Sequence, residues 1–350
     1  MSETLWSRRT RILRGPGGTR ILLDRRALAV WLILTLAVVA LAGVALTLGE
    51  TDLSLAEVWA PLNGHADDGT TRIVVEWRLP RVVIAILGGA ALALSGAIFQ
   101  SMTRNPLGSP DIIGFSTGSY TGALVVSLML GASTALIPVG AFVGGLVTAA
   151  AVYLLAYRRG EQGFRLIVVG IAVSAMLMAL NAYLLASARL EEAMSVAVWG
   201  AGTLNGIRWP QVVPVAIALA AFVPVIIVFV RRLRMLELGD DQARMLGVAI
   251  EPTRIIYLVA GVGLVATITA VAGPITFVAL AAPQIAKRIV GATGPNLTAS
   301  ALMGALLLLA SDVIAQRIIA PAQYPAGVVT ACLGGLYLVW LLTRREKGRA

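Results

Sequence analysis

Long apolar runs separated by short polar stretches dominate the chain. A membrane-spanning helix needs about 20 apolar residues, and most of these runs reach that length. The pattern predicts ten spans, at about 28–48, 80–102, 112–130, 136–157, 166–188, 212–230, 255–272, 274–287, 297–319 and 327–342. The short alternating segments typical of a membrane β-barrel are not visible. We therefore expect an all-α polytopic membrane protein with about ten transmembrane helices.

The polar stretches suggest how the chain is organised. Residues 1–26 carry seven arginines and are predicted to be a tail, residues 27–343 a transmembrane domain, and residues 344–350 a second tail. The stretch at 189–209 is too polar to span a membrane and is predicted to form a short surface helix followed by a turn.

Composition agrees with a membrane protein. The 350 residues are 58% hydrophobic and 13% charged, which is too apolar for a soluble domain of this size. Small residues recur four apart, and this spacing lets helices approach each other closely. They are Gly89, Ala93 and Ala97; Gly140 and Gly144; and Gly327, Ala331 and Gly335.

The net charge of +10 comes from arginines at the ends of apolar runs, so it predicts orientation rather than nucleic-acid binding. If the first tail is cytoplasmic, six of the 28 basic residues fall outside and 22 inside. The outer six are Arg72, Arg78, Arg81, Arg189, Arg208 and Arg317. Both termini and the stretch at 236–248 are then expected on the cytoplasmic side of the cytoplasmic (inner) membrane.

Several kinds of chemistry have no support in the sequence. Neither Lys287 nor Lys347 lies in the Gly-Lys-Ser/Thr pattern of a phosphate-binding loop, so we expect no ATP hydrolysis by this chain. The lone Cys332 and the lone His65 predict neither a disulfide nor a metal site. We expect a protein that is not an enzyme and holds no cofactor of its own.

Two carboxylates near or within the spans leave a second class of protein open. Carriers driven by protons or sodium bury carboxylates in the membrane, and Asp312 and Asp111 are the candidates. The alternative is that each side chain caps a helix or pairs with a polar neighbour.

The stretch at 236–248 is a charged segment between two apolar runs. Asp240 and Asp241 favour the start of a short helix, and Gly247 favours its end. Ala243 and Leu246 are expected to share a face of this helix, with Arg244 projecting elsewhere. The segment is either a contact for a cytoplasmic partner or a solvated loop.

Four ordered motifs resemble those of a known family. They are Arg78-Leu79-Pro80-Arg81 followed by Asn105-Pro106-Leu107; Leu238 to Arg244 with Leu246-Gly247; Gly273 to Val278 continuing through Pro283 to Arg288; and Tyr324 to Thr330. With them the chain resembles, from about the first span to the C-terminus, the FecCD family. These are permease subunits of type II ABC importers for ferric siderophores, haem and cobalamin. The resemblance implies the type II ABC importer permease fold.

The resemblance also implies partners. They are a second permease subunit (in a heterodimer or a homodimer), two cytoplasmic ATPase subunits that bind ATP and Mg, and an extracytoplasmic substrate-binding protein. It assigns ATPase coupling to Leu238, Gly239, Asp240, Asp241, Gln242, Ala243, Arg244, Leu246 and Gly247. It assigns binding-protein docking to Arg78, Arg81 and Arg317, for which anchoring at the membrane interface is the alternative for the first two. Asn181, Ser187 and Met194 are candidates for the translocation path, or else ordinary packing residues.

The chain departs from the family pattern at several positions. Gln284 and Lys287 replace a histidine and an arginine, and Gln323 replaces a glutamate. Gln316 stands where an arginine is common, with Arg317 one position later, which puts a third docking arginine in doubt. These differences suggest one half of a heterodimeric permease.

The sequence thus predicts a permease that moves a ferric siderophore, with cobalamin or haem as the alternative cargo. A secondary transporter that works alone and a membrane scaffold or receptor without transport are the alternatives from other classes.

Overall fold

The structure is a computed structural model that describes residues 10–14, 20–49, 51–64, 67–111, 114–129, 136–156, 163–291, 294–318 and 323–346. The interpretations given above for His65, for the outermost parts of the two tails (1–9 and 347–350) and for residues 15–19 lie outside the described residues.

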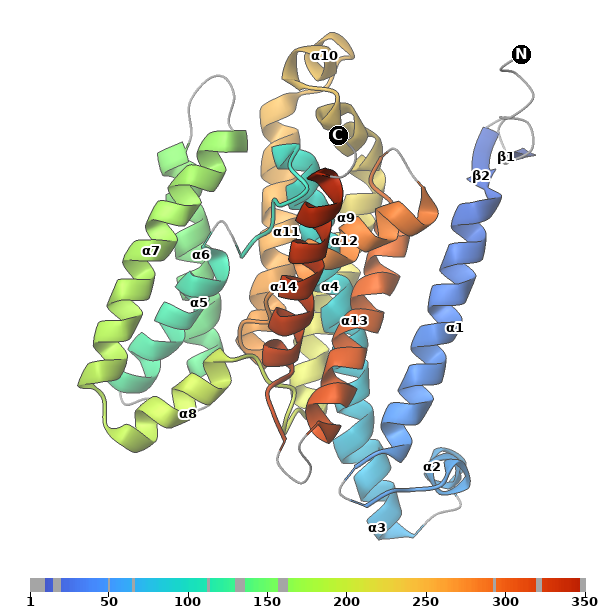
Figure 1. The fold of residues 1–350 in the computed structure, drawn as a ribbon, viewed down its shortest axis with the longest axis vertical. Coiled ribbons are helices and arrows are strands. Elements are labelled where there is room, and N and C mark those ends of the chain that lie inside the picture. The colour runs from blue at the N-terminus through green and yellow to red at the C-terminus, as the bar shows by residue number, and fades with distance from the viewer. Residues whose placement is uncertain are drawn as a thin grey trace.

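Helices make up nearly all of the described chain, and most of the long ones run roughly along one common direction, whereas α8 and α12 lie across it (Figure 1). In chain order the elements are β1 (Thr10–Arg14), β2 (Arg20–Asp24), α1 (Arg25–Thr47), α2 (Leu55–Leu62), α3 (Asp68–Thr71), the π-helix η1 (Arg72–Arg78), α4 (Leu79–Thr103), α5 (Phe115–Leu124), the π-helix η2 (Val125–Met129), α6 (Ile137–Ala156), α7 (Gly163–Ser187), α8 (Leu190–Gly200), α9 (Trp209–Glu237), α10 (Asp240–Met245), α11 (Ile250–Ala272), α12 (Val278–Val290), α13 (Leu297–Arg317) and α14 (Ala326–Glu346). The antiparallel hairpin β1–β2, with Thr10 opposite Asp24, was not predicted in the tail.

Each of the ten predicted spans overlaps helical structure, the third of them in two elements (α5 and η2), and the all-α membrane fold class is confirmed. Seven of the described helical segments are long and apolar enough to cross a bilayer, and α14 adds a shorter apolar stretch, Ala326–Val339. The helices α5 and α12 are short because each follows a break in the chain. Gly114 and Phe277, the residues that precede them, have left-handed φ angles of 86° and 67°.

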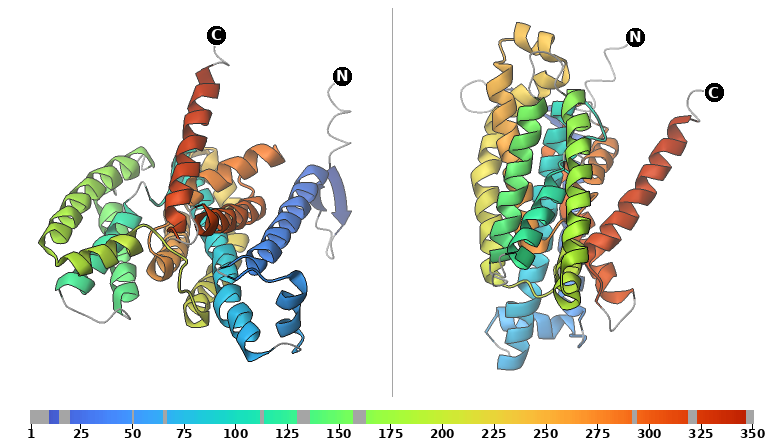
Figure 2. Two further views of the ribbon diagram at one scale, coloured as in Figure 1. Left: turned by 60° about the horizontal axis from the view of Figure 1, so that its bottom comes forward. Right: turned by 90° about the vertical axis from the view of Figure 1, so that its left-hand side faces the viewer.

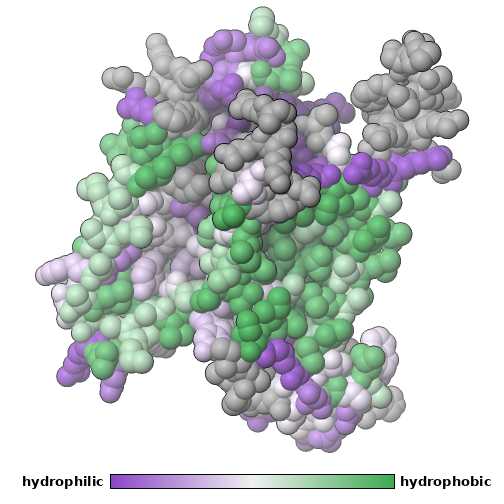
Figure 3. All heavy atoms as spheres, in the orientation of Figure 1, coloured by the Kyte–Doolittle hydropathy of each residue, from purple (hydrophilic) through white to green (hydrophobic). Residues whose placement is uncertain are grey.

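The short helix at 190–200 was predicted as a surface element and is α8. Apolar side chains cover the middle of the bundle, whereas hydrophilic side chains gather at its two ends (Figure 3). This distribution fits a belt of lipid around the middle of the protein.

The two ends of the bundle carry different elements. Helix α10 lies at one end, where α1 begins and α14 ends, and α2 and α3 lie at the other (Figure 1). We call these the α10 end and the α3 end. The start of α1, the end of α14 and the stretch at 236–248 lie at the same end, as the predicted topology requires (Figure 1). Which side of the membrane this end faces stays a prediction.

Helix α4 lies at the centre and packs against α9, α11, α12 and α13. Most of its residues from Val82 to Thr103 are buried. Glycines make this packing possible, because at each glycine the backbone of α4 touches the backbone of the neighbouring helix. A Cβ atom on Gly89 would lie 2.3 Å from the carbonyl oxygen of Gly304, and one on Gly96 would lie 1.7 Å from that of Ala279.

The other small-residue motifs have different outcomes. Gly140 and Gly144 pack against the backbone of Gly122 on α5, so their predicted packing role is confirmed. Gly327 packs against the backbone of Ala201, whereas Gly335 has no atom within 4 Å of where its Cβ would lie.

We expect Gly89→Val to destabilise the protein by about 1–3 kcal/mol, because the added methyl groups would force α4 away from α13. The matched control is Gly43→Val on α1, where a Cβ meets nothing within 4 Å. Thermal unfolding of the purified protein in detergent measures both. Equal unfolding midpoints for the two variants would contradict the close α4–α13 contact.

Candidate functional site

The first candidate site is the segment between α9 and α11. Its short helix α10 spans Asp240–Met245, as predicted, and projects beyond the bundle (Figure 1). Gly239 precedes the helix with a φ of 112°, and Gly247 follows it with a φ of 80°. Both angles favour glycine, so these two residues set the sharp turns into and out of α10.

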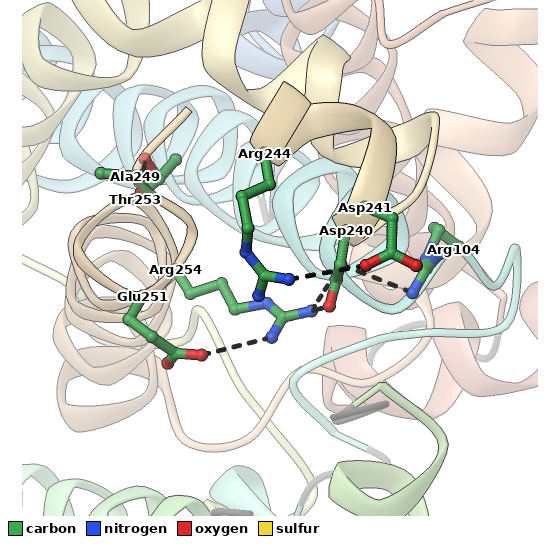
Figure 4. A network of polar contacts seen from close by, with 8 residues as sticks. All are labelled: Arg104, Asp240, Asp241, Arg244, Ala249, Glu251, Thr253 and Arg254. Carbon is green, nitrogen blue, oxygen red and sulfur yellow. Dashed lines mark hydrogen bonds and ion pairs between the residues drawn. The ribbon is translucent and has the colours of Figure 1, made fainter. Parts of the chain in front are cut away.

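Asp240 anchors this segment to the bundle (Figure 4). Its two carboxylate oxygens accept hydrogen bonds from Nη2 of Arg254 on α11, at 3.0 and 2.8 Å. The side chain of Arg254 is only 6% exposed. Arg104, which caps the end of α4, lies 3.6 Å away from the same carboxylate. Asp240 therefore joins α10 to both α11 and α4.

The outward-facing part of the segment has a different character. Leu238, Met245 and Leu246 are exposed large apolar residues, and Met245 is 80% exposed. Gln242 and Gly247 are exposed as well. Asp241 and Arg244 form a solvent-exposed ion pair, with 3.5 Å between their charged groups. Exposed apolar side chains on a projecting helix are typical of a protein contact.

One prediction about α10 needs correction. Ala243 and Leu246 do not share a face: Ala243 is fully buried against Leu236 and Val248, whereas Leu246 follows the end of the helix and is exposed. Met245, which is exposed on the same segment, was not among the predicted coupling residues. Its position directly between Arg244 and Leu246 was the available signal.

The second candidate site is a cavity of about 420 Å³ at the α3 end. The end of α1, one face of η1 and α4, the loop before α9 and the end of α13 line it. Ile73, Trp77 and Arg81 recur four residues apart along that face. This spacing aligns their side chains along one side of the helix.

Arg81 and Asp312 form a bidentate ion pair in the cavity. Nε and Nη2 of Arg81 each donate to one oxygen of Asp312, both at 2.9 Å, and Nη1 donates to Gln323 at 3.0 Å. Gln316 also donates to Asp312, whose side chain is 2% exposed. Asp312 is thus paired with a polar neighbour. Asp111, the other carboxylate considered for a proton relay, accepts a hydrogen bond from Ser116.

Arg78 lies in the same cavity but contacts backbone only. Its Nη1 donates to the carbonyl oxygens of Leu46 and Thr47, at 2.8 and 3.1 Å, and its Nη2 donates to that of Thr51. The guanidinium group therefore caps the last turn of α1, where the helix dipole favours a cation. These acceptors are neutral, and the carboxylate that acts on the charge of Arg78 is that of Asp52, which does not line the cavity.

Arg317 does not join this group. It pairs with Asp52, in the segment between α1 and α2, and is not among the residues that line the cavity. The hydrogen bond from Arg317 holds the pKa of Asp52 below its usual value, so this contact weakens as the pH falls. Gln316 and Gln323, where the family pattern has charged residues, both line the cavity. Arg208, which was not among the predicted docking residues, lines it as well.

The three candidates for the translocation path are not brought together. Asn181 is buried on α7, and its side-chain oxygen has no partner among the described residues. Ser187 donates to the carbonyl oxygen of Tyr183 within α7, and Met194 is exposed on α8. Among the described residues, no group of three or more His, Cys, Asp or Glu side chains is placed to hold a metal ion.

The structure is thus a bundle of apolar helices with a projecting helix, α10, at one end and a charged cavity at the other. The FecCD transport family matches residues 33–344, so the chain belongs to that family. Among its relatives is the ferric enterobactin transport system permease protein FepG of Escherichia coli (strain K12), 48% identical over 93% of this chain and 99% of that protein. The hemin transport system permease protein HmuU of Yersinia pestis is 32% identical over 87% and 92%.

A solved structure, described as an inward-facing conformation of a metal-chelate type ABC transporter, has the same fold. It is 28% identical, with a TM-score of 0.79, and covers 90% of this chain and 99% of that one. The predicted type II ABC importer permease fold is therefore confirmed.

We expect Asp240→Ala to destabilise the protein by about 2 kcal/mol, because it removes the nearer of the two carboxylates that pair with the buried Arg254, Asp240 at 2.8 Å and Glu251 at 3.8 Å. Asp241→Ala is the matched control, since Asp241 is almost fully exposed and should change stability little. Thermal unfolding in detergent compares them. The assignment of Asp240 as an anchor would be wrong if the two variants unfolded at the same temperature.

Proposed function

We propose that this chain is the permease subunit of an ABC importer that moves a ferric siderophore across the cytoplasmic membrane. The observation that carries the proposal is the 48% identity to a ferric enterobactin permease over nearly the whole of both chains. The haem permease among the relatives is more distant, at 32%. Haem therefore stays the alternative cargo, together with cobalamin.

The power source is a pair of cytoplasmic ATPase subunits, which bind ATP and Mg. Helix α10 is the part of this chain that contacts an ATPase subunit. Its exposed Leu238, Met245 and Leu246 supply an apolar contact, and Asp241 and Arg244 supply charges at its edge. This assignment places α10, and with it both termini, on the cytoplasmic side.

Movement of the ATPase subunits reaches the membrane helices through Asp240. Its contacts to Arg254 and Arg104 join α10 to α11 and α4. A displacement of α10 is therefore passed on to two helices of the core, which tilt and alternate the access to the path.

A second permease subunit completes the path. Helix α14 leans away from the rest of the bundle at its C-terminal end (Figure 2). It exposes Val328, Leu333, Leu336 and Val339, and α7 exposes a further apolar face that includes Met176. These faces fit contacts with a second permease, and the departures of the sequence from the family pattern favour a heterodimer.

The α3 end faces the extracytoplasmic binding protein. The cavity there carries Arg78 and Arg81 among its lining residues, and exposed acidic side chains on the binding protein are the complementary partner. Such charge pairs mainly set the rate and the register of docking.

We expect Met245→Asp and Leu246→Asp each to reduce co-purification of the ATPase subunits at least fivefold, because a carboxylate would be desolvated in an apolar contact. The control is Leu55→Asp, which alters an equally exposed leucine on α2 at the other end of the bundle. Its yield should match that of the unaltered protein. An undiminished yield for both α10 variants would argue against this contact.

The function is tested by uptake in a strain that lacks this chain, with labelled ferric enterobactin, haemin and cobalamin measured side by side. We expect ferric siderophore uptake to be lost and the other two to be retained. Loss of haemin or cobalamin uptake instead would keep the mechanism and correct the cargo. Uptake that survives loss of the ATPase subunits but stops with a protonophore would favour a secondary transporter.

A further inference from the structure

The cavity at the α3 end has an unbalanced charge. Three guanidinium groups line it, from Arg78, Arg81 and Arg208, against the single carboxylate of Asp312. Because Arg81 and Asp312 are joined by two hydrogen bonds of 2.9 Å, they neutralise each other. The excess positive charge is therefore carried by Arg78 and Arg208.

Arg208 is held in place by the loop that precedes α9. The backbone N–H of Thr203 donates to the carbonyl oxygen of Ala272 at 2.7 Å, which ties the loop to the end of α11. Nε1 of Trp209 donates to the carbonyl oxygen of Val75 at 2.9 Å, which ties it to η1. The chain is thus tied to neighbouring elements on both sides of Arg208, at Thr203 in the loop and at Trp209 in the first turn of α9.

The neighbours of the Arg208 side chain do not neutralise its charge, so the charge is available to a binding partner. Its guanidinium carbon lies 5.5 Å from the centre of the Trp77 ring, a cation–π arrangement that orients the group without cancelling its charge. Among the described residues no carboxylate forms an ion pair with Arg208. The planar group is suited to bind a carboxylate with two parallel hydrogen bonds.

We propose that Arg208 is a docking residue that takes a carboxylate side chain of the extracytoplasmic binding protein, with Arg78 beside it. Arg81 holds the shape of the cavity through Asp312 and is not the main contact. Arg208 thereby fills the place of a third docking arginine, which Arg317 does not fill because it pairs with Asp52 outside the cavity. This proposal rests on the proposed function, since it needs a binding protein at the α3 end.

The test measures binding of the cognate binding protein, loaded with ferric enterobactin, to the assembled transporter in lipid nanodiscs. We expect Arg208→Gln to raise the dissociation constant about tenfold and to make binding less dependent on salt. Arg208→Lys should raise the dissociation constant less than Arg208→Gln does, because lysine keeps the positive charge. It should still bind more weakly than the unaltered transporter, because lysine lacks the planar group. Arg189→Gln is the matched control: Arg189 is exposed at the start of α8 and does not line the cavity.

The outcomes separate this inference from the proposed function. If the Arg208→Gln transporter binds the binding protein as tightly as the unaltered one does, the inference is overturned and the proposed function is left intact. Equal losses for Arg208→Gln and Arg189→Gln also overturn it, because the effect would then be one of overall charge. An unaltered transporter that binds none of the binding protein overturns the proposed function itself.

A charge exchange tests the contact without relying on loss alone. Arg208→Glu should block docking, and a lysine in place of one acidic residue on the docking face of the binding protein should restore it. The unfolding temperature and the yield of ATPase subunits should stay unchanged, which excludes misfolding as the cause. Failure of every acidic position on that face to restore docking would overturn the inference.

Discussion

Close contact between glycine backbones on α4 and its neighbours is the constraint on which the rest of the structure depends. Gly89 meets Gly304 on α13, and Gly96 meets Ala279 on α12, at distances that leave no room for a side chain. In lipid there is little hydrophobic driving force between helices, so association relies on such packing. These contacts fix α4 as the centre of the bundle and fix the positions of α12 and α13 around it.

Both candidate sites are built on the ends of this one helix. Arg81 in its first turn pairs with Asp312 on α13, and Arg104 at its C-cap lies beside Asp240 of the α10 segment. The 25 residues of α4 make it about 37 Å long, close to the thickness of a bilayer. A helix held rigidly along its length therefore connects the cavity at the α3 end with the contact helix at the α10 end.

The charged side chains fall into two groups: those that anchor one element to another, and those that face the solvent and can contact a partner. Asp312 is buried, Asp240 is half-buried, and both are paired with arginines, so they hold elements in place. Asp241, Arg244 and Arg208 are exposed and have either a weak surface partner or no carboxylate partner among the described residues. Neighbouring residues in one motif thus have opposite tasks: in the pair Asp240-Asp241 the first anchors and the second faces outward.

Sequence alone indicated the all-α membrane class, the positions of the main apolar helices, the family and the place of α10. Each of these depends on local properties: the length of apolar runs, helix-capping residues such as Asp240 and Gly247, and ordered motifs. Only the tertiary structure decided which charges are paired, because Arg81 and Asp312 are 231 residues apart in the chain. It also showed that Ala243 is buried while Met245 is exposed, that Arg317 lies outside the cavity, and that Arg208 lines it. Contacts between distant segments depend on which helices pack together, and the local small-residue spacing shows that a face packs closely without showing against which helix.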